Sequence, residues 1–262
     1  MKFRLKMASL CFCFYLFAWV PGVQAEEAGP RLVTVTPVLQ LLGETLVMET
    51  GIELEYLPPS RLPLNRIPAW LYRVDPGDLP QADGLLTLES LVTELAIYPA
   101  LRRKNIRIVP VDAAQELAPG GAQVSLHPER GGQDYFWLDL NNMIVMLNIM
   151  SRDLSRLWPD AAAQLEDNRR TASAAIQRAA MQVDEHLFTQ QISSLSLSDA
   201  RLTPLALMTA LPLEEAPGGD LLIAPSPVEG QATWVVEPLN RPTQLSLQAW
   251  LDGLVAGLVR HQ

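Results

Sequence analysis

One proline-rich segment of the sequence offers side chains that could hold a ligand. Residues 58–70 directly follow a predicted strand and contain four such side chains: Arg61, Asn65, Arg66 and Trp70. In an open α/β sheet, ligands bind beside the carboxyl ends of the strands. Arginine next to an aromatic ring can hold an anionic group and a flat apolar group together. We therefore expect this segment to form one side of a binding site.

A second candidate is the aromatic and acidic cluster Asp134–Asp139. Tyr135, Trp137 and Asp139 could offer a hydroxyl group, an aromatic face and a carboxylate to the same ligand. The alternative is structural: the apolar members of the cluster are core, and the others only mark the start of a helix. The sequence leaves both interpretations open.

Residues for metal binding or nucleophilic catalysis are scarce. The chain has three histidines, His127, His186 and His261, and none forms an i, i+4 pair or a zinc-site spacing. There is no Gly-x-Ser-x-Gly elbow and no phosphate-binding Gly-Lys loop. A hydrolytic carboxylate pair at Asp134 and Asp139 stays open as an alternative. We expect a binding protein with no catalytic residues, no metal ligands and no resident cofactor, and not an enzyme.

Residues 1–25 have the features of a secretory signal peptide. Three basic residues precede an apolar run over 7–20, and the segment ends in a small-x-small pattern before Glu26. Cleavage before Glu26 is the prediction, and an uncleaved anchor is the alternative, although the run is short for a membrane span. Both cysteines, Cys11 and Cys13, lie within this segment. The exported chain would therefore lack disulfides and thiolate sites.

The composition is that of an acidic globular protein. The 262 residues are 48% hydrophobic, with 20 basic and 29 acidic side chains and a net charge of −9. Losing the three basic residues of the signal peptide leaves 17 basic side chains against 29 acidic ones, a net charge of −12. Such a chain can bury a sizeable core. It is unsuited to binding nucleic acid over a broad face, because neutralising phosphates requires a positive field. We expect no nucleic-acid partner.

Strand and helix patterns alternate along the first half of the chain. Strands are expected over 31–36, 52–57, 82–88 and 106–111, with helices over 37–51 and about 89–103. The alternation predicts a parallel sheet, with the half-polar strand 52–57 near its edge. A loop is expected over 112–132, followed by a helical region over 141–188 that is either one bent helix or two helices in series. Two short strands, at 220–224 and 233–236, are then expected before a final helix over 246–259.

The order of these parts resembles a known family. The chain carries Leu-Val-Thr-Val-Thr-Pro, then Leu-Pro-Pro at a strand end, then residues 102–112, then Phe-Trp-Leu-Asp-Leu-Asn-Asn before the long helix. This order resembles the periplasmic solute-binding receptors of zinc and manganese ABC importers over residues 31–190. Trp137, Leu138, Asp139 and Asn141 match the family's Pro-His-x-Trp-Leu-(Asp/Ser)-Pro-x-Asn pattern.

The resemblance implies an α/β fold of two small lobes joined by a long backbone helix, with the ligand between the lobes. The implied division is a signal peptide over 1–25, an N-terminal α/β lobe over 26–140, a linking helix over 141–188 and a short C-terminal α/β lobe over 189–262. A helical linker of this kind allows only limited hinge motion.

The departures from the family pattern affect the metal ligands. This chain has Pro63 and Leu64 where the family has its first metal-binding histidine, and it has Tyr135 where the family has the second. No histidine follows the long helix at the place of the third. Without three imidazoles, a bare divalent ion would lose most of its binding energy. The chain is similar to the divergent receptors associated with the recycling of iron siderophores such as pyoverdine.

That similarity implies a ligand larger than an ion. A ferric chelate brings its own oxygen ligands, so the protein need supply only shape, aromatic faces and arginine or tyrosine contacts. We expect a periplasmic protein that binds an iron siderophore or another metal chelate. Its partners would be an inner-membrane ABC permease and a second, metal-binding receptor.

Two other functions stay open. In the first, Tyr135, Asp134, Asp139 and His127 form an oxygen-rich site for iron, manganese or zinc. In the second, the protein has lost ligand binding and serves as an accessory protein that docks another periplasmic receptor.

Overall fold

The first half of the chain forms a four-stranded parallel sheet. The computed structural model describes residues 29–128, 133–216 and 218–259, so the predicted signal peptide lies outside the described residues. The strands are β1 (Arg31–Thr34), β2 (Glu53–Tyr56), β3 (Gly84–Thr87) and β4 (Val109–Asp112), in the order β2-β1-β3-β4. Every neighbouring pair is parallel. The parallel sheet and the edge position of β2 confirm the sequence-based predictions.

Three helices accompany this sheet: α1 (Pro37–Val47), α2 (Ile67–Leu71) and α3 (Tyr98–Lys104). The helix expected over 89–103 is shorter than predicted, since only a 3-10 turn, η2 (Thr93–Leu95), precedes α3. The Glu89 carboxylate accepts hydrogen bonds from the backbone N–H groups of Ile97 and Tyr98, at 2.9 and 3.1 Å. That carboxylate satisfies donors at the start of α3, and Pro99 suits its first turn, so the helix begins late.

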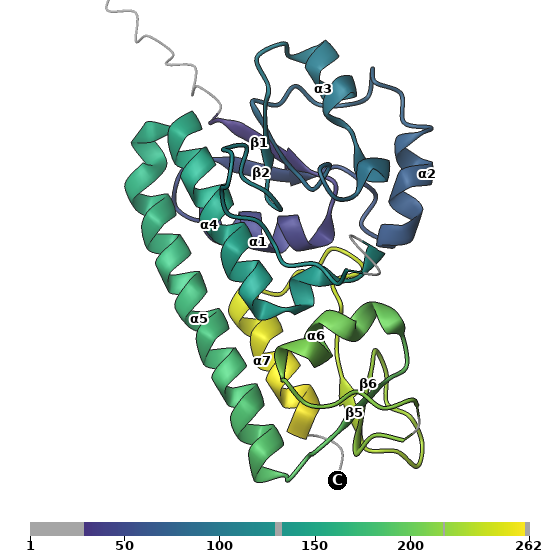
Figure 1. Cartoon of the computed structure of the whole chain (residues 1–262). Coiled ribbons are helices and arrows are strands. Elements are labelled where there is room, and N and C mark those ends of the chain that lie inside the picture. Colours follow the sequence, from purple (N-terminus) through teal and green to yellow (C-terminus); the bar gives the residue numbers. More distant parts are fainter. Residues whose placement is uncertain (1–28, 129–132, 217, 260–262) are drawn as a thin grey trace, which may run out of the picture.

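A helical hairpin joins the two halves of the chain. The helical region expected over 141–188 is two helices, α4 (Leu140–Leu157) and α5 (Ala162–Thr189), separated by the 3-10 turn η5 (Pro159–Ala161). The two helices lie side by side, and α5 runs along the whole molecule (Figure 1). Helix α5 contacts α1 of the first lobe as well as α7 (Leu247–Val259) of the second. Helix α5 therefore packs against both lobes.

The second lobe is a small parallel α/β unit. Strands β5 (Leu195–Leu197), β6 (Leu221–Ala224) and β7 (Thr233–Val235) pair in sequence order and are all parallel. Helices α6 (Thr203–Met208) and α7 accompany them. The strands expected at 220–224 and 233–236 and the final helix are confirmed. The sequence patterns did not indicate β5 or α6, because a three-residue strand and a six-residue helix are too short to establish a periodicity.

One buried cluster runs through both lobes. It contains Leu32 and Val38 of the first lobe, Leu165 and Ile176 of α5, and Trp234 of the second lobe. A separate apolar cluster lies on the other face of the first sheet, under α2 and α3. Within the described part of the chain, no helix has the length and apolar character needed to cross a membrane.

Candidate functional site

A cavity of about 560 Å³ lies between the two lobes. The first lobe lines it with Thr36, Leu64, Asn65, Pro68, Leu88 and Leu91–Leu95. The opposite side is lined by Gln133–Tyr135, Trp137, Arg201 and Asn240. Because both lobes contribute, the size and shape of the cavity depend on how the lobes are held.

The first-lobe wall follows from the parallel sheet. Thr36 comes just after β1, and the Leu88–Leu95 segment follows β3, so both lie at the carboxyl edge of the sheet. The third piece, η1 (Leu64–Arg66), comes from the proline-rich segment. Its Leu64 N–H donates a 2.8 Å hydrogen bond to the carbonyl oxygen of Asn240. This main-chain bond ties the two lobes together at the cavity.

Aromatic side chains form the opposite wall. Residues Phe136–Leu138 make the 3-10 turn η4, which packs against α6. The ring centroids of Tyr135 and Trp137 lie 5.5 Å apart in a tilted arrangement. The Trp137 indole N–H donates to the carbonyl oxygen of Pro238 at 3.0 Å, which fixes the ring. The wall thus combines a fixed aromatic surface with polar side chains, and among the described residues the buried Oδ1 of Asn240 has no hydrogen-bond partner.

Arg201 brings positive charge to this wall. Its guanidinium carbon lies 4.8 Å from the centroid of the Tyr135 ring, and its Nη2 is 2.6 Å from a carboxylate oxygen of Asp199. Burial raises the pKa of Tyr135, and the nearby Arg201 partly offsets that rise. The hydrogen bond to Asp199 raises the pKa of Arg201. At physiological pH the wall therefore presents a neutral phenol beside a permanent cation.

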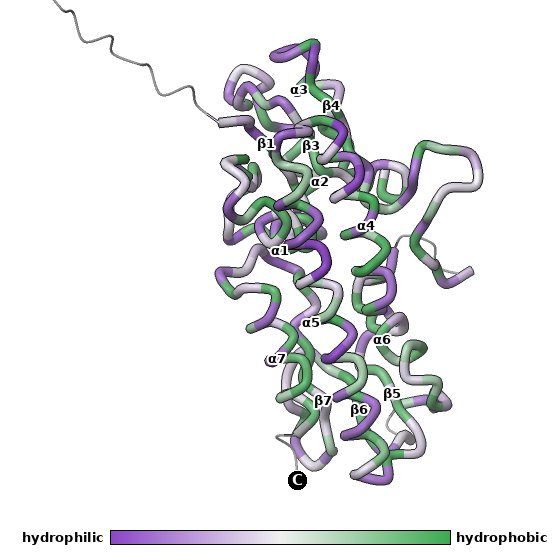
Figure 2. Tube along the Cα trace, turned by 90° about the vertical axis from the view of Figure 1, so that its left-hand side faces the viewer, coloured by the Kyte–Doolittle hydropathy of each residue, from purple (hydrophilic) through white to green (hydrophobic). Residues whose placement is uncertain are grey.

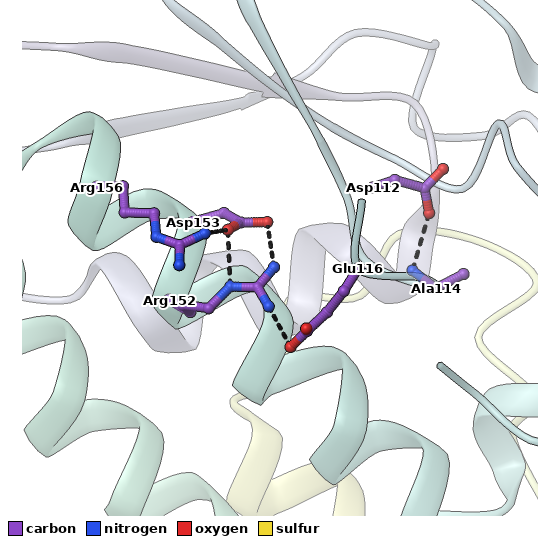
Figure 3. Close-up of polar contacts among 6 residues, drawn as sticks. All are labelled: Asp112, Ala114, Glu116, Arg152, Asp153 and Arg156. Atoms are coloured by element: carbon purple, nitrogen blue, oxygen red, sulfur yellow. Dashed lines mark hydrogen bonds and ion pairs between the residues drawn. The ribbon is translucent and has the colours of Figure 1, made fainter. Parts of the chain in front are cut away.

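The loop that leads into this wall is fixed to α4 at two places. Figure 3 shows Arg152 of α4 between Glu116 of the loop and Asp153, whose carboxylate it holds through two 2.8 Å hydrogen bonds. Further along, Asn142 accepts a hydrogen bond from the Ser125 N–H and donates to the carbonyl oxygens of Ser125 and Phe136, all at 2.7–2.8 Å. The loop and η4 are thereby held by one helix.

Replacing Asn142 with alanine should destabilise the protein by about 2–3 kcal/mol. The substitution removes a buried amide that makes three hydrogen bonds, and the backbone groups of Ser125 and Phe136 lose their partners. Urea unfolding of the variant measures this. The control is Asn141→Ala, since Asn141 is the neighbouring residue, is exposed, and should change stability by less than about 0.5 kcal/mol. Equal stability of the two variants would show that Asn142 does not hold the loop.

Three of the seven sequence candidates line the cavity: Asn65, Tyr135 and Trp137. The other four are not among its lining residues. Arg61 and Arg66 are exposed, and Trp70 packs against the separate apolar cluster of the first lobe. Asp139 caps α4, where its carboxylate accepts the Asn141 N–H at 2.9 Å. This geometry agrees with the alternative interpretation of Asp139, in which the residue marks the start of a helix.

Sequence reasoning missed Arg201 and Asn240. Arg201 lies on the 3-10 turn η6 (Ala200–Leu202), and Asn240 follows β7, far along the chain from the two segments that the sequence singled out. The Asp-Ala-Arg sequence at 199–201 was the one feature that could have drawn attention to Arg201. An aspartate can cap a turn and form an ion pair with an arginine two residues later in the chain.

The described residues contain no group of three or more histidine, cysteine, aspartate or glutamate side chains that could hold a metal ion. His127, Asp134 and Asp139 therefore do not form such a group.

Solved structures with the same fold are solute-binding proteins. The zinc-bound ZnuA-like domain of AdcA from Streptococcus pneumoniae is 14% identical, with a TM-score of 0.61, and the match covers 88% of this chain and 98% of that one. The solute-binding protein FpvC from Pseudomonas aeruginosa is 12% identical in its Ni²⁺ complex, with a TM-score of 0.64 and coverage of 88% and 94%. Its Mn²⁺ complex is also 12% identical, with a TM-score of 0.61 and coverage of 87% and 95%.

No protein-family model and no curated protein matches the sequence. At such low identity, the structural likeness establishes the fold. The chain has the two-lobe α/β fold of these solute-binding proteins, with a long helix along both lobes. The resemblance drawn from the sequence is confirmed at this level.

Proposed function

We propose that this protein is the periplasmic solute-binding component of an ABC importer and that it holds a metal chelate between its lobes. The observation that carries the proposal is the cavity of about 560 Å³, lined by both lobes of a solute-binding fold. Structures of the same fold were solved with zinc, nickel or manganese bound, which supports a role in metal import.

The cavity favours a chelate over a bare ion for two reasons. Its volume lies within the roughly 300–1,000 Å³ of sites that enclose drug-sized ligands, which is far more than one ion needs. In addition, the described residues provide no cluster of metal ligands. A ferric chelate carries its own oxygen ligands, so the protein needs to recognise only the outer surface of the complex.

Three of the lining residues support an iron siderophore as the ligand. The rings of Tyr135 and Trp137 offer flat apolar surface to a catechol or chromophore, and Arg201 offers a cation to the anionic oxygens around the iron. We infer that the cavity encloses the iron-bearing part of the siderophore and that a large siderophore such as pyoverdine extends beyond it. Delivery would then be to an inner-membrane permease, with a second metal-binding receptor as a further partner.

Titration calorimetry of the chain that begins at Glu26 tests the proposal. We expect submicromolar binding of a ferric siderophore, for which ferripyoverdine is the first probe, and no submicromolar binding of free Fe²⁺, Mn²⁺ or Zn²⁺. The iron-free siderophore serves as the control for recognition of the chelator alone.

Two other results of the titration would favour the alternative functions. Tight binding of one free ion at one-to-one stoichiometry would contradict the chelate proposal and favour an oxygen-rich metal site. An absence of binding to every chelate and ion would favour the accessory protein that only docks another receptor.

A further inference from the structure

A basic cluster lies at one end of the first lobe. Arg102, Arg103 and Lys104 end α3, and Arg107 follows in the turn before β4, so four of six consecutive residues are cationic. All four are exposed, in a chain whose net charge is −9. Together with Pro99, three of them and Ile106 border a surface hollow of about 620 Å³.

The contacts that the structure gives these cations are with a carbonyl oxygen and with an aromatic ring. In the described residues, none of the four forms an ion pair with a carboxylate, whereas Arg152, Arg169 and Arg201 each do. Lys104 donates to the carbonyl oxygen of Gly77, and Arg102 lies against the ring of Tyr98. Their positive charge therefore faces the solvent, where an external anionic partner could contact it.

Two carboxylates near the cluster accept hydrogen bonds from backbone N–H groups. Asp83 accepts the Arg31 N–H at 2.9 Å, and Asp75 accepts the Gly77 N–H at 2.7 Å. Asp78 lies in the same exposed loop as Asp75. These carboxylates reduce the positive field that the four exposed cations create.

An exposed apolar side chain lies within the cluster. Ile106 is 71% exposed, between Lys104 and Arg107 in sequence. Bulky apolar side chains flanked by cations are typical of protein surfaces that rest on a membrane interface, where the apolar group enters among the headgroups and the cations meet lipid phosphates.

The position of the cluster fits a membrane better than a permease. Figures 1 and 2 both place α3 at the end of the molecule farthest from the second lobe. A permease that distinguishes closed from open lobes must contact both of them, but this cluster belongs to the first lobe alone.

We propose that the basic end formed by Arg102–Arg107 binds the phosphate groups of an anionic membrane surface, with Ile106 among the headgroups. The receptor would then be held at the membrane that carries its importer, while its cavity stays free for ligand. This role does not depend on which ligand the cavity takes.

Vesicle co-sedimentation of the chain that begins at Glu26 tests the proposal without any contribution from the signal segment. We expect binding to phosphatidylcholine vesicles that contain phosphatidylglycerol and none to pure phosphatidylcholine, with affinity falling about tenfold or more from low to physiological salt. The double charge reversal Arg103→Glu and Arg107→Glu should weaken binding to the anionic vesicles by about tenfold or more.

The matched control is Arg170→Glu with Arg178→Glu, two exposed arginines of α5 that change the net charge by the same amount. It should bind within about twofold of the parent chain. Circular dichroism verifies that all variants are folded. Failure of the parent chain to bind anionic vesicles at low salt would overturn the proposal, as would equal losses in the two double variants. Binding to polyglutamate but not to vesicles would assign the cluster to an acidic protein partner instead.

Discussion

Gly257→Ala should destabilise the protein by about 3 kcal/mol or more, the largest effect that we expect of any single added methyl group. A Cβ atom at this position would clash with the carbonyl oxygen of Val235 and would lie 3.5 Å from the Trp234 ring. The obstructing atom belongs to the backbone of β7, so no side-chain rotation relieves the clash. Helix α7 would have to move away from the sheet of the second lobe.

Thermal unfolding measures this effect, with a fall in Tm of roughly 6–12 °C expected for a chain of this size. The control is Gly253→Ala, one turn earlier on the same helix, where an added Cβ meets no atom within 4 Å. That change should raise stability by up to about 1 kcal/mol, since alanine favours helix over glycine. Similar stability of the two variants would mean that α7 does not pack closely on β7.

Arg201→Ala should lower the affinity for a ferric siderophore by about 10- to 100-fold, the effect of losing a charge-assisted hydrogen bond in a partly enclosed site. Arg201 is the cation among the described residues that line the cavity, and its guanidinium covers the Tyr135 ring. The same calorimetric titration measures the loss. Arg170→Ala is the control, because Arg170 is exposed on α5 and should leave the affinity unchanged.

A second variant separates ligand contact from positioning. Asp199→Asn removes the partner carboxylate of Arg201 and keeps the shape of the side chain. If Arg201 contacts an anionic ligand directly, affinity should hold or rise, because the guanidinium loses a competing negative charge. Unchanged affinity in Arg201→Ala would contradict a ligand contact by this arginine. A large loss in Asp199→Asn would show that the arginine must first be oriented by its neighbour.

The fold was predictable where the sequence repeats a pattern over many residues. The strands β1 and β3 have apolar, buried residues at their centres, and the half-polar β2 lies at the edge of the sheet, as expected for a strand with one face in water. The long helical region was recognisable too, although sequence alone left open whether it bends or breaks. Pro159 decides this, because it begins a new turn after Trp158 instead of continuing α4.

The candidate site was only partly predictable, for a physical reason. Tyr135 and Trp137 stand in a distinctive local cluster, so their sequence context marks them. Arg201 and Asn240 reach the cavity through the packing of the second lobe, and their neighbours in sequence carry no comparable signal. Arg61 and Arg66 are exposed on a loop and do not line the cavity, whereas an arginine from another segment, Arg201, does.

The continuous packing along α5 has a consequence for how the molecule can be divided. Asn168 of this helix donates to the carbonyl oxygens of Leu46 and Met48 in the first lobe, at 2.8 and 2.7 Å, while the same helix contacts α7 beneath the second. A cut between the lobes would therefore divide the larger buried cluster, which contains residues of both lobes and of α5. We therefore expect the two lobes to unfold together, so a destabilising substitution in either lobe should lower the stability of both.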